Sequence, residues 1–132
     1  MKQTVLCVDD DIAILNVLDQ LLHEDYYVIT HTLPEKALSN IISDPSIILV
    51  ISDHRMPGMT GLEMFRRLKE LSPGREIYSI IYSGFSEVEH LMEEMINSKV
   101  INEFMTKTCP SNKLLTAVER GIKKMSERLK SH

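Results

Sequence analysis

Short apolar runs alternate with amphipathic segments five times along the chain. The apolar runs are bounded by polar or turn-forming residues, which is typical of strands. The predicted strands are residues 4–8, 26–30, 46–52, 76–83 and 100–105. After each run, apolar residues recur at the three- and four-residue spacing of a helix. The predicted helical segments are residues 14–22, a short segment opened by Pro34, and residues 62–71, 88–96 and 114–129.

The run at residues 46–52 (SIILVIS) lacks the alternation of a half-exposed strand, so it predicts a central strand buried on both faces. Regular strand–helix alternation favours a parallel sheet with right-handed crossovers and helices on both faces. For a chain of 132 residues, we expect an α/β fold. Its predicted form is a (βα)5 doubly wound parallel sheet with strand order 2-1-3-4-5, a flavodoxin-like three-layer sandwich.

The composition is that of an ordinary globular domain, with 43% hydrophobic and 26% charged residues. A net charge of −4 gives no reason to expect direct nucleic-acid binding by the whole surface. Residues 107–132 hold seven Lys and Arg against two Asp and Glu. This basic end predicts a solvated helix face, with a membrane- or nucleic-acid-binding tail as the alternative.

The two cysteines, Cys7 and Cys109, are too few for a disulfide framework, and Cys7 is expected to be a small buried apolar residue. No apolar run approaches the roughly 20 residues of a membrane span. The first residues also lack the long apolar core of a signal peptide. We therefore expect a cytoplasmic protein that does not contact the membrane.

Polar side chains follow four of the predicted strands, at the edge where ligands bind in parallel sheets. They are Asp9, Asp10 and Asp11 after the first strand, Asp53 after the third, Ser83 after the fourth and Lys107 after the fifth. Clustered carboxylates need a cation, and oxygen-only donors favour Mg²⁺. Mg²⁺ beside a lysine and a hydroxyl is typical of phosphoryl transfer. Because the chain has no Gly-rich nucleotide loop, the Asp53 carboxylate is the candidate nucleophile.

Simpler interpretations stand beside these. Asp11 is expected to cap the helix that begins at Ile12 rather than to bind metal. Asp9 and Asp10, taken alone, could equally be solvated capping acids. His54 is expected to be an exposed loop residue that points away from Asp53, because side chains alternate along a strand.

The motifs together resemble a response-regulator receiver domain of two-component signalling, of the chemotaxis-regulator-like kind. The resemblance rests on the acidic pair after the first strand, D-x-x-M-P-x-x-x-G from Asp53 to Gly61, Ser83-Gly84, and F-x-x-K from Phe104 to Lys107. It covers essentially the whole chain. We expect a receiver domain over residues 1–125, followed at 126–132 by the end of the last helix or a linker to an output domain.

The resemblance implies that Asp53 receives a phosphoryl group from a histidine-kinase phosphohistidine and becomes 4-aspartylphosphate. It implies a Mg²⁺ held by Asp53, by Asp10 directly, by Asp9 through water and by the carbonyl of Arg55. After transfer, Ser83 and Lys107 would each bind a phosphoryl oxygen. Phe104 would turn inward when Ser83 is recruited and so act as the switch residue.

Two features depart from the family pattern. The family usually has Lys-Pro after the fifth strand, joined by a cis peptide, whereas this chain has Lys107-Thr108. Since a non-proline cis bond costs about 3–4 kcal/mol, we predict a trans bond. Arg55 and Phe85 occupy the two variable positions near the site, and we hypothesise that they shield the acyl phosphate from water.

The expected function is a phosphorylation-dependent switch in a phosphorelay, not a turnover enzyme. Its partners would be a histidine kinase or phosphotransfer protein, and an output domain or downstream protein that reads the face of helix four, strand five and helix five. The segment from Met95 to Lys107 resembles that of receivers fused to cyclic-dinucleotide phosphodiesterase modules. A second copy of the chain, in a homodimer, is a further candidate partner. The alternatives are a receiver that acts without phosphorylation, or a Mg²⁺-dependent phosphatase or phosphotransferase with Asp53 as nucleophile. The phosphatase strand motif is missing, because Arg55 stands two residues after Asp53.

Overall fold

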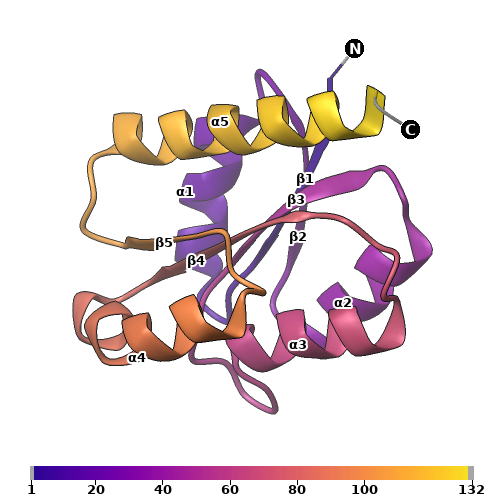
Figure 1. Cartoon of the computed structure of the whole chain (residues 1–132). Helices are drawn as coiled ribbons and strands as arrows, with labels where there is room; N and C mark the ends of the chain where they lie inside the picture. Colours follow the sequence, from indigo (N-terminus) through magenta and orange to yellow (C-terminus); the bar gives the residue numbers. More distant parts are fainter. Residues whose placement is uncertain (1, 131–132) are drawn as a thin grey trace.

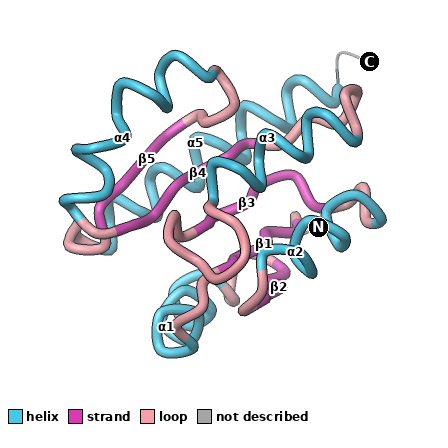
Figure 2. Tube along the Cα trace, turned by 90° about the horizontal axis from the view of Figure 1, so that it is seen from below, coloured by secondary structure: helices cyan, strands magenta, loops and turns pink. Residues whose placement is uncertain are grey.

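A computed structural model describes residues 2–130, and of α4 it leaves six side chains undescribed: Phe85, Val88, His90, Met95, Ile96 and Ser98. The strands are β1 (Thr4–Val8), β2 (Tyr27–His31), β3 (Ile47–Ser52), β4 (Tyr78–Ser83) and β5 (Glu103–Thr106). All neighbouring strands pair in parallel, in the order β2-β1-β3-β4-β5. Figure 2 shows this order from β2 at one edge to β5 at the other. The predicted fold class and strand order are confirmed.

Five helices connect and cover the strands: α1 (Ile12–Leu22), α2 (Pro34–Ser43), α3 (Gly61–Leu71), α4 (Phe85–Ser98) and α5 (Ser111–Lys130). Helices α1 and α5 lie on one face of the sheet, and α2, α3 and α4 lie on the other (Figure 1). This is the expected three-layer sandwich. Residues 126–130 continue α5, while the end of the domain near residue 125 stays a prediction.

Side-chain alternation along the strands divides the core into two halves. On β1, Val5 and Cys7 belong to the core under α1 and α5, whereas Leu6 and Val8 belong to the core under α2 and α3. All six residues of β3 are buried, as its unbroken apolar run predicts. Each large aliphatic side chain buried in this way contributes about 1.5–3 kcal/mol, so the two cores fix the sheet between its helices.

The fourth and fifth strands start later than their apolar runs suggest. The hydroxyl of Ser79 donates to the carbonyl of Val100 at 2.6 Å, and the backbone N–H of Ser79 donates to Asn102 Oδ1 at 2.8 Å. These bonds turn the chain at residues 100–102 toward β4, so that the β5 ladder begins only at Glu103. The apolar residues of this turn add burial without joining the strand.

Other local expectations also hold. Cys7 is fully buried, and burial raises the pKa of its thiol to about 12. Within residues 2–130, none of the helices is both long and apolar enough to cross a membrane. The described chain contains no cis peptide bond, so the predicted trans bond between Lys107 and Thr108 is confirmed.

Candidate phosphorylation site

The three acids after β1 have different surroundings. Asp9 is buried at 1% exposure, and its Oδ1 accepts the backbone N–H of Asp11 at 2.9 Å. Asp10 is exposed. Asp11 caps α1, because its side chain accepts the backbone N–H of Ala13 at 2.9 Å. The prediction that Asp11 caps this helix is confirmed.

Asp53 lies directly after β3, beside the end of β1. Its backbone N–H donates to the carbonyl of Val8 at 2.9 Å, which extends the β1–β3 pairing by one residue. Gly61, the first residue of α3, donates its N–H to the carbonyl of His54 at 2.9 Å. A Cβ atom at Gly61 would collide with the backbone oxygen of Asp53. The glycine of the motif is therefore needed for α3 to approach the site this closely.

The side chains of Asp9, Asp10 and Asp53, here called the acidic cluster, each offer a carboxylate oxygen, and these oxygens lie within 4.8 Å of one another. Carboxylate oxygens are the ligands that hard divalent cations prefer. Asp10 is exposed, so the acidic cluster borders solvent and leaves space for water, which Mg²⁺ retains when it binds. The donor set therefore fits Mg²⁺, as the sequence predicts for these three residues. The carbonyl of Arg55 as a further ligand stays a prediction.

One oxygen of Asp53 carries all of the carboxylate's described contacts. Asp53 Oδ1 accepts the backbone N–H of His54 at 2.8 Å and the hydroxyl of Ser83 at 3.0 Å. The ammonium of Lys107 lies 3.4 Å from the same oxygen. Among the described residues, no hydrogen bond engages Oδ2. The described hydrogen bonds thus fix the carboxylate through one oxygen only.

Lys107 lies between two carboxylates. Its Nζ is 2.9 Å from Asp9 Oδ2 and 3.4 Å from Asp53 Oδ1. Burial raises the pKa of Asp9, although the hydrogen bond from Lys107 acts in the opposite direction. Burial alone would lower the pKa of Lys107, but its hydrogen bond to Asp9 and the nearby Asp53 raise it. Lys107 is therefore a firmly charged cation that supplies part of the positive charge the cluster needs.

The position of Lys107 does not depend on a proline. Its backbone N–H donates to the carbonyl of Ser83 at 2.8 Å, which ties the end of β5 to the end of β4. The hydroxyls of Thr106 and Thr108 lie 3.0 Å apart and brace the turn that follows. A trans Lys107–Thr108 bond thus still directs the lysine into the site.

The sequence-based expectation for His54 is wrong. His54 is only 6% exposed, and burial lowers its pKa. Its ring Nδ1 is buried without a hydrogen-bond partner among the described residues. Side-chain alternation predicts that His54 points away from Asp53, but it does not predict whether the side chain is exposed or buried. Burial arises because the loop after β3 is covered, which strand periodicity alone cannot reveal.

Arg55 makes a contact that the sequence analysis missed. Its Nε lies 2.6 Å from the carboxylate of Glu87, which joins the loop after β3 to the first turn of α4. An acid in the first turn of a helix was the available signal, but it does not identify the partner. The side chain of Phe85, the second residue of the shielding hypothesis, lies outside the described residues.

Phe104 is half-buried and packs against the core under α2 and α3. It pairs in register with Ile81 of β4, two residues before Ser83. Its position is thus adjacent to the strand that ends in the site. A switching role for Phe104 stays a prediction.

The five-stranded parallel fold and the acidic cluster at the ends of β1 and β3 are those of a receiver domain. The family profile of the response regulator receiver domain matches residues 5–119, and the chain belongs to this family. Receiver domains are generally signalling domains rather than enzymes, and they typically bind Mg²⁺ at an acidic pocket.

Known proteins resemble this chain over nearly its full length. The hydrogenase transcriptional regulatory protein HoxA of Cupriavidus necator is 28% identical over 92% of this chain, but the chain spans only 24% of that protein. The crystal structure of adenylate cyclase from Rhodopirellula baltica superposes with a TM-score of 0.86 at 30% identity, covering 99% of this chain and 95% of that one. A CheY-like receiver domain protein from Methanospirillum hungatei superposes with a TM-score of 0.81 at 26% identity, covering all of both chains.

Proposed function

We propose that Asp53 accepts a phosphoryl group from a histidine-kinase phosphohistidine in the presence of Mg²⁺, and that the product acts as a signalling switch. The observation that carries this proposal is the asymmetric setting of the Asp53 carboxylate. Oδ1 is held by His54, Ser83 and Lys107, while Oδ2 has no described hydrogen bond. A fixed carboxylate with one uncommitted oxygen is suited to nucleophilic attack.

In the transfer step, an Asp53 oxygen would attack phosphorus as the bond from phosphorus to the histidine nitrogen breaks. The histidine nitrogen keeps the electron pair of this bond and, with a proton on the other ring nitrogen, leaves as neutral imidazole; the product is an acyl phosphate. Bound Mg²⁺, held by Asp9, Asp10 and Asp53, would neutralise charge on the phosphoryl oxygens. Lys107 Nζ and Ser83 Oγ already point at Asp53, so they need little reorganisation to bind the transferred group.

We propose that the signal leaves through the face formed by α4, β5 and α5. Ser83 and Lys107 are joined through the backbone, and Phe104 lies on the strand that links them to this face. A shift of Ser83 toward a phosphoryl oxygen would move β5, because the two are hydrogen-bonded through the backbone. Phe104 on β5 would then act as the switch residue. The receiver of the signal would be an output domain, a cyclic-dinucleotide phosphodiesterase module being one candidate, or a second copy of the chain. We place this exchange in the cytoplasm, where a histidine kinase presents its phosphohistidine.

Two other functions make different predictions. A receiver that acts without phosphorylation would keep its partner contacts when Asp53 is replaced. A phosphatase or phosphotransferase would release product repeatedly, whereas the switch is expected to phosphorylate itself once and lose the group slowly. The basic last helix could in principle attract nucleic acid, but we propose no direct nucleic-acid binding by this domain.

The proposal is tested by incubating the protein with acetyl phosphate and Mg²⁺ and measuring its intact mass. We expect one added phosphoryl group that is stable in acid and labile in base. Asp53→Asn should remove it, and omission of Mg²⁺ should prevent it. A well-folded protein that takes up no phosphoryl group would favour the phosphorylation-independent receiver. Steady release of phosphate over many turnovers would favour the enzyme.

A further inference from the structure

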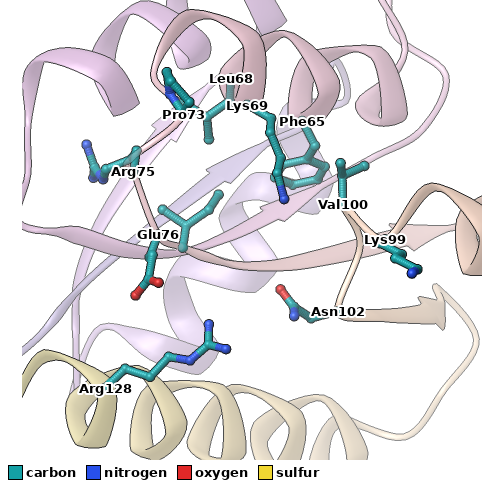
Figure 3. A pocket seen from close by; sticks show the side chains of 11 residues that line it. Phe65, Leu68, Lys69, Pro73, Arg75, Glu76, Lys99, Val100, Asn102 and Arg128 are labelled. Atoms are coloured by element: carbon teal, nitrogen blue, oxygen red, sulfur yellow. The ribbon is translucent and has the colours of Figure 1, made fainter. Parts of the chain in front are cut away.

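A pocket of about 330 Å³ opens at the amino ends of β4 and β5, between the last turns of α3 and α5 (Figure 3). It lies at the opposite end of the sheet from the acidic cluster. Ser83 is at the carboxyl end of β4 and Tyr78 at the amino end, a separation of roughly 17 Å at ~3.3 Å per residue. The pocket is therefore separate from the proposed phosphorylation site.

Cationic side chains from opposite faces of the sheet reach this pocket. Lys69 comes from α3 and Arg128 from α5, and both line the pocket; in Figure 3 Lys69 lies beside the ring of Phe65, and Arg128 reaches the pocket from the side of α5. Within residues 2–130, neither side chain is within ion-pair distance of a carboxylate. The net charge of the chain is −4, yet these two unpaired cations line the same pocket. Their positive potential favours the binding of an anion there.

A third donor is fixed by the turn before β5. Asn102 Oδ1 accepts the backbone N–H of Ser79 at 2.8 Å and its hydroxyl at 3.0 Å. Because a backbone N–H can only donate, this assigns the oxygen of the amide and leaves its NH₂ group as a donor. Figure 3 shows the Asn102 side chain extending into the space between Lys69 and Arg128.

Three further charged residues line the pocket: Lys99, which is exposed and follows the end of α4, Arg75 and Glu76. Arg75 donates to the backbone carbonyls of Ile41, Asp44 and Ile47, so its guanidinium is committed to holding the end of α2. Glu76 is the one carboxylate among the residues that line the pocket. It offers an acceptor beside the donors and would favour a ligand that carries a hydroxyl as well as a negative charge.

The simplest alternative is that the cations only neutralise helix ends. Lys69 and Arg128 both lie in the last turn of their helices, where a positive charge is favourable. The helix end carries about half a negative charge, however, and each side chain supplies a full positive one. Neutralisation also gives no reason for the two side chains to share a hollow with a fixed amide donor.

We propose that this pocket binds a small organic phosphate that carries a hydroxyl group. The phosphate oxygens would accept from Lys69, Arg128 and the Asn102 amide, a donor set that matches tetrahedral phosphate oxygens. Glu76 would accept from the ligand hydroxyl. The volume is within the range of small-molecule sites. Such a ligand would bridge α3, α5 and the turn before β5, and would give the domain a second input.

The test uses glycerol 3-phosphate as the probe, titrated into ¹⁵N-labelled protein in Mg²⁺-free buffer at constant ionic strength. We expect saturable amide shifts around Lys69, Asn102 and Arg128, and at least a tenfold weaker affinity in Lys69→Gln and in Arg128→Gln. Lys36→Gln and Lys123→Gln remove the same charge from exposed positions outside the pocket and should leave the affinity unchanged.

Titrations with inorganic phosphate and with glycerol measure separately how the phosphate group and the hydroxyl group of the proposed ligand contribute to binding. Glu76→Ala should weaken the binding of glycerol 3-phosphate relative to that of inorganic phosphate, because the variant loses the acceptor for the ligand hydroxyl, whereas the loss of negative charge favours both anions alike. Shifts that do not saturate, shifts confined to the loops around Asp53, or equal losses in the control variants would each overturn the proposal. The last result would show general charge screening.

Discussion

The ammonium of Lys107 lies 2.9 Å from Asp9 Oδ2 and 3.4 Å from Asp53 Oδ1. The lysine is thus paired first with an acid of the proposed metal site and only second with the proposed phosphoacceptor. It supplies part of the positive charge that the acidic cluster requires in the absence of metal. Mg²⁺ bound at the proposed metal site would therefore compete with Lys107 for Asp9.

Removal of this lysine charge should tighten Mg²⁺ binding. Two unit charges about 4 Å apart repel by about 1 kcal/mol even in water, which corresponds to about a fivefold change in affinity. We expect Lys107→Gln to lower the Mg²⁺ dissociation constant about fivefold or more, measured by calorimetry. Lys113→Gln, an exposed lysine on α5, serves as the matched control. An unchanged affinity in Lys107→Gln would show that the lysine and the metal do not compete.

Asp10→Asn should stabilise the metal-free protein. The exposed Asp10 carboxylate adjoins that of Asp9 and shares a cluster with Asp53, so its removal relieves like-charge repulsion. A gain of about 1 kcal/mol would raise the melting temperature by roughly 3 °C. The same variant should lose Mg²⁺-dependent phosphorylation. If thermal unfolding and phosphorylation are both unchanged, Asp10 is only a solvated surface acid.

The effect of Asp9 on stability should depend on pH. Its pKa is raised above the ordinary value of 3.8, mainly by burial. A raised pKa means that the folded protein holds this proton more tightly than the unfolded chain, so stability is lost as the pH rises through the folded-state pKa. Asp9→Asn should therefore match the wild type below about pH 4 and be more stable than it at neutral pH. Chemical unfolding across this range measures the difference, and a gain that is constant with pH would contradict it.

The fold was predictable because its determinants are local and periodic. The unbroken apolar run of β3 and the recurring strand–helix pattern suffice for the strand order, and the order brings Asp9, Asp10 and Asp53 together. The contacts of Arg55 and His54 were not predictable, since both depend on how the loop after β3 meets α4. Lys107 also lies nearer to Asp9 than to Asp53, and the spacing of residues in the sequence does not predict so small a difference in distance.

The ion pair between Arg55 and Glu87 gives the shielding hypothesis a specific contact. It joins the loop after β3 to α4 beside the site. Exposed ion pairs contribute up to about 1 kcal/mol, so its loss should speed dephosphorylation by no more than about fivefold. We expect Glu87→Gln and Arg55→Ala to shorten the lifetime of the phosphorylated form to a similar extent, and Arg55→Ala with Phe85→Ala to shorten it further. Identical lifetimes in all variants would rule out shielding.

Gly61 should tolerate no side chain. A Cβ atom there would collide with the Asp53 carbonyl and come within 3.0 Å of the Ser52 hydroxyl, both of which belong to the packed end of β3. Overpacking of this kind costs about 1–3 kcal/mol, so Gly61→Ala should lower stability and disturb Asp53 together. Gly74→Ala is the matched control, because nothing lies within 4 Å of its added Cβ. Equal unfolding curves for the two variants would refute this role of Gly61.

The most direct test of the central claim is to locate the acyl phosphate chemically. Borohydride reduces an aspartyl phosphate to homoserine, which tandem mass spectrometry identifies at a single position. After incubation with acetyl phosphate and Mg²⁺, we predict homoserine at position 53 and at no other aspartate, with none formed when Mg²⁺ is omitted. Reduction at Asp9 or Asp10, or no reduction in a folded protein that binds Mg²⁺, would contradict the assignment of Asp53 as the phosphoacceptor.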